Sequence, residues 1–143
     1  MRIVLDTSVL IAGTRSAAGA SRQFLMAALE RRFELLLSVP LALEYEAVLK
    51  RPEQLKVAGA TIQEVDILMD ALIAVSEPVH RAFFWRPMLR DANDDMVLEV
   101  ALSGHADFLV TFNRKDFDSA VPMVHVLSPQ LTLKEIGRRD EKK

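Results

Sequence analysis

The sequence predicts a three-layer α/β/α sandwich around a central, mostly parallel sheet of about five strands. Short runs of β-type composition alternate with longer segments of helical period, an alternation typical of βα units. Half of the 143 residues are hydrophobic, which is enough for one continuous core. We therefore expect a single domain over residues 1–137, followed by a charged, frayed tail over 138–143.

The strand runs, in chain order, are RIVLD, FELLLSV, AVSEPV, DFLVTF and MVHVLS, at 2–6, 33–39, 74–79, 107–112 and 123–128. Helical periodicity predicts helices at 20–32, 40–50, 61–73 and 93–104, and a last short helix after Pro129. Pro52 is expected to end the second helix, because proline breaks a helix interior. The segment TRSAAGAS at 14–21 is typical of a flexible loop.

Composition limits the possible function. A net charge of −2 excludes a globally basic nucleic-acid binder but allows a local basic rim. The absence of cysteine excludes disulfides, thiolate zinc sites and a cysteine nucleophile, and makes a reducing cytoplasm the expected compartment. Because neither a signal-peptide pattern nor an apolar run of about 18 residues is present, we expect a soluble cytoplasmic protein with no membrane contact.

Asp6 ends the first apolar run and is followed at once by Thr7 and Ser8. If the strand spans 2–6, the acid lies at the carboxyl edge of a parallel sheet, where α/β proteins place their functional groups. Capping of a helix that starts at Thr7 or Ser8 explains the same acid equally well. The choice between these interpretations depends on the other acids.

Glu44 falls within the apolar stripe of the 40–50 helix, together with Leu41, Ala47 and Val48. Glu46, on the opposite face, can instead pair with Lys50 four residues later. A carboxylate in an apolar stripe has no such surface role. This pattern makes Glu44 a candidate functional residue.

Asp94 shares a helical face with Val97, Leu98 and Ala101 and should therefore point towards the sheet. Helix capping and attraction to the helix dipole account for Asp91 and Asp95, but less readily for three aspartates within five residues. We take Asp94 as a functional candidate, and leave Asp91 open between capping and function.

The stretch TFNRKDF follows the fourth strand and places Thr111, Asn113 and Asp116 at or beyond its carboxyl edge, beside Arg114 and Lys115. An ordinary turn has the same composition, so the stretch supports a site only in combination with the other acids.

Such acids need a cation if they converge, since two like charges about 4 Å apart repel by roughly 4 kcal/mol at an effective dielectric near 20. The three histidines, His80, His105 and His125, show no metal-ligand spacing and are assigned to the surface or to packing. An all-oxygen site indicates Mg²⁺ or Mn²⁺ rather than zinc.

The segments IVLDTSVLI, SVPLALEYEAVL and DANDDMVLEVALSGHADFLVTFNRKDF, in this order, resemble the PIN domain (PilT N-terminus). The resemblance covers nearly the whole chain. It is closest to the single-domain bacterial and archaeal proteins classed as toxins of toxin–antitoxin systems, which are related to VapC-type ribonucleases. It implies a PIN-like, flavodoxin-like fold.

The resemblance places the acids of the family on Asp6, Glu44 and Asp94. At the fourth position many PIN domains have aspartate where this chain has Asn113, whereas VapC-type proteins often have asparagine there and an aspartate in a following DF, here Asp116. Whether Asn113 or Asp116 completes the site stays open. The residues expected to support these acids are Thr7, Ser8, Asp91, Thr111 and Asn113.

The resemblance implies a metal-dependent ribonuclease whose acids hold one or two Mg²⁺ or Mn²⁺ ions that activate water against the phosphodiester. It also implies hydrolysis to 5′-phosphate and 3′-hydroxyl ends, a small antitoxin partner and a homodimer. RNA binding beside an acidic site needs nearby cations, of which Arg114 and Lys115 lie nearest the motif. The other candidates are Arg15, Arg22, Lys50, Arg51, Arg86 and Arg90. The aromatic run 83–85 is assigned to the core rather than to base stacking.

Other functions fit less well. A haloacid dehalogenase-type phosphatase needs an acid at position 8, which is Ser8, and a receiver domain leaves Glu44 unexplained. The five glycines form neither nucleotide-binding pattern, GxGxxG or GxxxxGK[ST]. The remaining alternative is a PIN-like protein that has lost catalysis and serves as an RNA-binding or protein-interaction scaffold, for which Asn113 is the supporting feature.

Overall fold

The computed structural model describes residues 1–80, 89, 91–120 and 123–141. Five parallel strands form one sheet in the order β3-β2-β1-β4-β5. They are β1 (Arg2–Leu5), β2 (Glu34–Leu37), β3 (Ser76–Pro78), β4 (Phe108–Val110) and β5 (His125–Leu127). Each predicted strand run contains one of these strands, and the parallel sheet confirms the predicted fold class.

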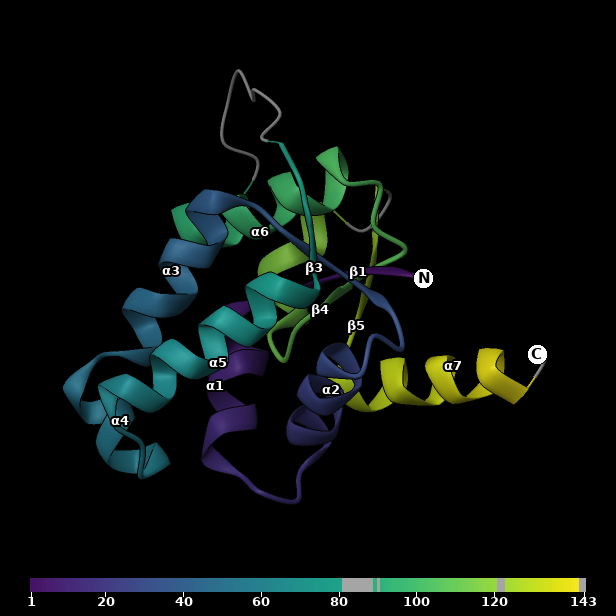
Figure 1. Ribbon diagram of the computed structural model, residues 1–143. Coiled ribbons are helices and arrows are strands. Elements are labelled where there is room, and N and C mark those ends of the chain that lie inside the picture. Colours follow the sequence, from purple (N-terminus) through teal and green to yellow (C-terminus); the bar gives the residue numbers. More distant parts are fainter. Residues whose placement is uncertain (81–88, 90, 121–122, 142–143) are drawn as a thin grey trace.

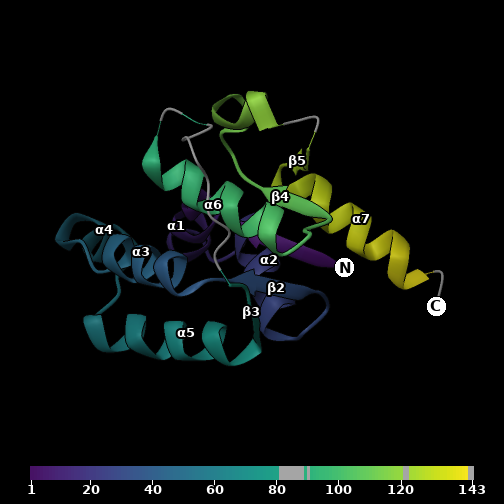
Figure 2. The same cartoon turned by 90° about the horizontal axis from the view of Figure 1, so that it is seen from above.

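The helices in the described part of the chain are α1 (Thr7–Arg15), α2 (Ala20–Leu29), α3 (Val39–Leu49), α4 (Pro52–Ala58), α5 (Ile62–Val75), α6 (Ala92–Ser103), α7 (Pro129–Glu141) and the 3-10 helix η1 (Arg114–Ala120). Helix α6 packs on β1, β2 and β4, whereas α5 packs on β2 and β3, and α7 packs on β4. Figure 1 shows α6 above the sheet and α2 and α7 below it. Figure 2 shows α3, α4 and α5 gathered at one side of the molecule and α7 at the other. The sheet is thus the middle layer of the predicted sandwich.

The periodicity of the sequence missed α1, α4 and η1. Helix α1 buries Val9, Leu10 and Gly13, too short an apolar pattern to stand out, and it runs into the segment expected as a loop. Pro52 does not end the preceding helix, which stops at Leu49. It begins α4, because a proline at the first helical position loses no hydrogen bond. Helix α4 ends at Gly59, whose φ of 65° suits glycine.

The last helix is longer than expected. Helix α7 continues through residues 138–141, which were assigned to the charged tail, and ends at Glu141. An ion pair of 2.7 Å joins Arg32 to Asp140, and the guanidinium of Arg139 lies 5.8 Å from the centre of the Phe108 ring. These contacts hold the end of α7 against the body of the domain.

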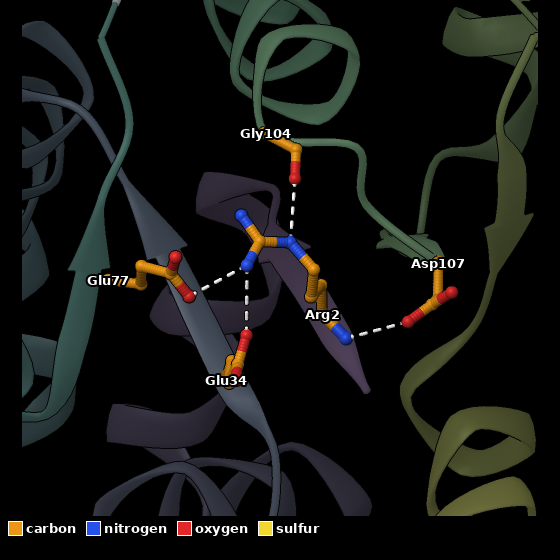
Figure 3. A network of polar contacts seen from close by, with 5 residues as sticks. All are labelled: Arg2, Glu34, Glu77, Gly104 and Asp107. Atoms are coloured by element: carbon orange, nitrogen blue, oxygen red, sulfur yellow. Dashed lines mark hydrogen bonds and ion pairs between the residues drawn. The ribbon is translucent and has the colours of Figure 1, made fainter.

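Arg2 ties the amino end of the sheet together (Figure 3). Its Nη1 pairs with Glu34 Oε2 at 3.0 Å and with Glu77 Oε2 at 2.8 Å, and its Nε donates to the Gly104 carbonyl at 2.7 Å. The main-chain N–H of Arg2 donates to Asp107 Oδ2 at 2.8 Å. The Arg2 guanidinium, hydrogen-bonded to Glu77, lowers the pKa of that carboxyl. The acids at this end of the strands therefore have a structural partner.

The opposite, carboxyl end of the sheet contains a topological switch. The chain proceeds from β1 to β2 and β3 on one side and from β4 to β5 on the other, so the direction reverses between β1 and β4. Open parallel sheets bind their ligands at the carboxyl ends of the strands at such a point. Asp6 directly follows β1 and Thr111 directly follows β4, which places both residues there.

Candidate functional site

Asp6 is held by two hydroxyl groups. Ser8 Oγ and Thr111 Oγ1 each donate to the same carboxylate oxygen, Asp6 Oδ2, at 2.7 Å. The Asp6 side chain is 6% exposed and makes no capping hydrogen bond, although the residue occupies the N-cap position of α1. The capping interpretation is therefore wrong for its side chain. The hydroxyls fix one oxygen and leave Oδ1 outside these bonds.

Main-chain amides hold the two hydroxyls in turn. The Asn113 N–H donates to Thr111 Oγ1 at 2.9 Å, and the Phe112 N–H lies 3.4 Å from Ser8 Oγ. Thr111 is fully buried. Each hydroxyl accepts a hydrogen bond from an amide and donates its own proton to Asp6. Both hydroxyls are therefore oriented as donors to the carboxylate oxygen.

Asp94, in the first turn of α6, is half-buried and is affected by the charges of the other candidate acids. Burial, followed by the charges of Asp6, Asp91, Asp116 and Asp95, raises the pKa of Asp94 to about 6. The interacting acids come from the end of β1, from α6 and from η1, and α6 packs against both of the other elements. Val97, Leu98 and Ala101 are buried on the face predicted to point inwards.

Asp6, Asp94 and Asp116 differ from the acids at the amino end of the sheet in their ion pairing. Among the described residues, no lysine or arginine forms an ion pair with Asp6, Asp94 or Asp116. A structural role normally offsets gathered carboxylates with a guanidinium or an ammonium, as Arg2 does. A half-buried carboxylate with a raised pKa, as at Asp94, is typical of functional sites.

Asp91 and Asp95 have structural roles at the start of α6. Asp91 is the N-cap, and its Oδ1 accepts from the Asn93 N–H at 2.8 Å, which confirms the capping interpretation. Asp95 Oδ1 accepts from the Leu89 N–H at 2.8 Å and holds the segment before the helix. Both acids still contribute negative charge to Asp94.

Two residues of the TFNRKDF stretch, Asn113 and Asp116, act on the site in different ways. Asn113 supplies its main-chain N–H to Thr111, whereas the carboxylate of Asp116 is one of the charges acting on Asp94. Both side chains are exposed, as are those of Arg114 and Lys115 at the start of η1. Thr7, the first residue of α1, is half-buried.

Glu44 is the candidate acid on α3. The buried residues of α3 are Leu41, Tyr45, Val48 and Leu49, while Ala47 is exposed, so the predicted stripe is rotated and Glu44 lies half-buried at its edge. Glu44 is not among the charges that raise the pKa of Asp94. Helix α3 nevertheless packs against α1 and α6, the helices that follow Asp6 and carry Asp94.

Tyr45, which the sequence analysis missed, links α3 to the site. Its side chain is fully buried, and its hydroxyl donates to the main-chain carbonyl of Leu5, the residue before Asp6. Burial, followed by the charge of Asp6, raises the pKa of Tyr45, which keeps the hydroxyl a donor. Its position four residues after Leu41 is the sequence signal that could have identified it as part of the buried stripe.

Of the other predicted RNA-contacting cations, four lie among the described residues, and three of these have protein partners. Arg15 Nε donates to Gln54 Oε1 at 2.8 Å, and Arg22 Nε donates to the Gly13 carbonyl at 2.6 Å. Lys50 pairs with Glu46, as predicted, at 2.8 Å and with Asp66 at 2.6 Å. Arg51 is exposed before α4. Arg86, Arg90 and the aromatic run 83–85 lie outside the described residues.

The carboxylates of Asp6 and Asp94 fit a hard divalent cation that is completed by waters and substrate phosphates. Within residues 1–80, 89, 91–120 and 123–141, no three His, Asp or Glu side chains form a ready-made metal-binding group. Mg²⁺, however, keeps several waters and is usually held by one or two carboxylates together with substrate phosphates. Asp6 and Asp94, two mutually repelling carboxylates with oxygen donors only, match that pattern. The exposed His80, His105 and His125 are on the surface, as expected.

A cavity of about 300 Å³ lies away from these acids, between α1, α2, α4 and α5. Leu25, Leu49 and Val65 contribute apolar surface to it, and Arg22 and Glu64 contribute charge. No predicted site acid lines it. In the described part of the chain, no helix is long and apolar enough to span a membrane.

Comparison with known proteins identifies the family. A family model described as PIN domain matches residues 2–115, which contain Asp6, Glu44, Asp94 and Asn113 and end one residue before Asp116. No curated protein matches the chain. The match spans β1 to β4 and most of the sequence, and PIN domains are generally nucleases that use divalent metals. The chain belongs to the PIN domain family.

Proposed function

We propose that the protein is a metal-dependent endoribonuclease that hydrolyses RNA phosphodiester bonds in the cytoplasm. The observation that carries the proposal is the position of Asp6, which Ser8 and Thr111 hold at the switch point of the sheet and whose charge helps to raise the pKa of Asp94 on the adjacent helix α6. The family assignment supports a nuclease. The all-oxygen donor set supports Mg²⁺ or Mn²⁺.

Asp6 and Asp94 are the main proposed ligands. Ser8 and Thr111 hold Asp6 Oδ2, so that the other oxygen, Oδ1, is available to bind. One or two divalent ions at these carboxylates would polarise the scissile phosphate and lower the pKa of a bound water. Arg114 and Lys115 would contact flanking phosphates and offset their charge beside the acidic site.

Asp116 is the proposed fourth acid, in preference to Asn113. The support is that the charge of Asp116 acts on Asp94, whereas Asn113 is used through its main-chain amide. Glu44 is proposed to join the site from α3 when metal and RNA bind, since α3 packs against α6.

We also propose that the protein is the toxin of a toxin–antitoxin system and forms a homodimer. Resemblance to the VapC-related toxins supports this role. The cavity between α1, α2, α4 and α5, with its apolar walls and the charged side chains of Arg22 and Glu64 in its lining, offers a place for a side chain of a small antitoxin. Growth arrest on expression of the wild type, but not of Asp94→Asn, supports the toxin role, and growth unaffected by either protein contradicts it. Light scattering measures the dimer.

The nuclease is tested with the purified protein on single-stranded and structured RNAs in Mg²⁺ or Mn²⁺, with EDTA controls. Asp6→Asn and Asp94→Asn should abolish cleavage while remaining folded by circular dichroism. Asp70→Asn, an exposed aspartate of α5, is the matched control and should cleave like the wild type. Products should carry 5′-phosphate and 3′-hydroxyl ends, because the attacking oxygen comes from water.

A second candidate is a catalytically inactive scaffold that binds RNA or a protein. The observation that favours it is that the described residues contain no ready-made group of three metal ligands. The scaffold function is supported if no sample cleaves RNA while the wild type still binds it. Cleavage by Asp6→Asn and Asp94→Asn at the wild-type rate would show that the proposed active site is wrong.

A further inference from the structure

Phe112 is an exposed aromatic residue two positions after the end of β4, with 51% of its surface accessible. The other phenylalanine and tyrosine rings of the structurally described residues are buried or half-buried: Phe24, Phe33, Tyr45, Phe108 and Phe117. A phenyl ring left in water gains nothing for folding. Its place in the fold therefore decides whether the exposure has a use.

The backbone of Phe112 is part of the site framework. Its N–H lies 3.4 Å from Ser8 Oγ, and Ser8 Oγ donates to Asp6 Oδ2 at 2.7 Å. The preceding residue, Thr111, donates to the same carboxylate oxygen. The backbone of Phe112 is thus linked to Asp6 through two successive hydrogen bonds.

The residues that follow Phe112 carry positive charge. Arg114 and Lys115 are exposed, and neither forms an ion pair with any residue that the structure describes. An exposed ring followed closely by unpaired cations is the combination with which proteins bind single-stranded nucleic acids: bases stack on the ring and the cations follow the backbone.

We propose that Phe112 stacks on an unpaired base next to the scissile phosphate, with Arg114 and Lys115 on the adjoining phosphates. The proposal rests on the proposed nuclease function. A base inside a duplex cannot offer its face to the ring, and unstacked bases are the usual targets of aromatic side chains in RNA recognition.

Exposure alone would not support this role, since single apolar residues are common on protein surfaces. Ile67 on α5, for example, is 68% exposed. What distinguishes Phe112 is its connection to Asp6 and its two cationic neighbours. Ile67 provides a matched control, because α5 packs on β2 and β3 rather than at the site.

The test measures RNA binding in EDTA, which removes divalent metal and so prevents metal-dependent cleavage. Fluorescence anisotropy compares the wild type with Phe112→Ala, Phe112→Leu, Phe112→Trp and Ile67→Ala. The ligands are a short single-stranded RNA, its duplex, and a set of single strands with one abasic nucleotide at each successive position. Cleavage in Mg²⁺ by each variant is measured separately, so loss of stacking and failure of the nuclease assignment give different results.

We expect Phe112→Ala and Phe112→Leu to weaken binding of the single strand about tenfold, within the five- to hundredfold range of base stacking, while Phe112→Trp and Ile67→Ala bind like the wild type. One abasic position should weaken the wild type by a similar factor and have no further effect on Phe112→Ala. The proposal is overturned if Phe112→Ala binds the single strand like the wild type, or if Phe112→Leu does. It is also overturned if Phe112→Ala weakens binding of the duplex and of the single strand equally, or if it instead changes the oligomeric mass.

Discussion

Tyr45 donates its hydroxyl hydrogen bond to the main-chain carbonyl of Leu5, the last residue of β1. Carbonyls alternate along β1: that of Arg2 accepts from Asp107 beside β4, and that of Met1 accepts from Glu34 of β2. The Leu5 carbonyl therefore faces the β2 side, where strand pairing has ended at Ile3. Tyr45 supplies the missing donor and sets the position from which Asp6 departs.

Tyr45→Phe should destabilise the fold by about 1–3 kcal/mol, because it leaves a buried carbonyl unpaired. The free energy of unfolding is measured by urea denaturation. Metal affinity and cleavage should fall as well, since the end of β1 loses its anchor. Phe33→Leu, a buried aromatic change in the body of the core, is the control for destabilisation alone. Unchanged unfolding in Tyr45→Phe would argue against the anchoring role.

Asp94 should make stability fall as pH rises. Its pKa is about 6 in the folded protein, above the ordinary value of 3.8, so the folded state binds more protons than the unfolded state across that interval. The Tm of Asp94→Asn should therefore exceed that of the wild type at about pH 7.5 and approach it near pH 4. Mg²⁺ should raise the Tm of the wild type more than that of the variant. A Tm difference independent of pH would contradict this assignment.

Thr111→Val removes the hydroxyl that joins Asn113 to Asp6 and keeps the volume of the side chain. The Mg²⁺ concentration for half-maximal cleavage should rise about tenfold or more, as for other residues that orient metal ligands. Thr111→Ser should restore it. Thr132→Val also removes the hydroxyl of a fully buried threonine, but in α7, and should leave the Mg²⁺ dependence unchanged. Equal effects of the two valine variants would remove Thr111 from the site.

Arg2→Met should lower stability at neutral pH and much less in acid. Arg2 holds the pKa of Glu77 below its ordinary 4.5, so this pairing stabilises the fold above that pH and is lost as the carboxyl is protonated. Tm measured from about pH 3 to 7.5 checks the trend, which is opposite to that expected from Asp94. Metal dependence should not change, since Arg2 lies at the other end of β1 from Asp6. A shift in Mg²⁺ dependence would contradict a purely structural role.

Local patterns were sufficient for the strands and for the inward face of α6. Val97, Leu98 and Ala101 are buried where a period of 3.6 places them, and Asp94 is half-buried. Local patterns were insufficient for α1 and α4, whose apolar patterns are short. They were also insufficient for Pro52, because a proline can end one helix or begin the next. The length of α7 was also missed, because its ion pair with Arg32 joins residues 108 positions apart.

The sequence by itself determined the α/β class, the parallel sheet and the candidate acids, because burial on a strand or a helix face leaves a period that adjacent residues record. Only the tertiary structure decided which acids act together. Asp6 could have been a cap or a site residue, and the hydroxyl of Thr111, 105 positions away, settles what its side chain contacts. Three other features likewise depend on contacts between distant segments, which no local period can encode. They are the effect of the other acids on the pKa of Asp94, the half-buried position of Glu44 at the edge of α3 and the anchor from Tyr45.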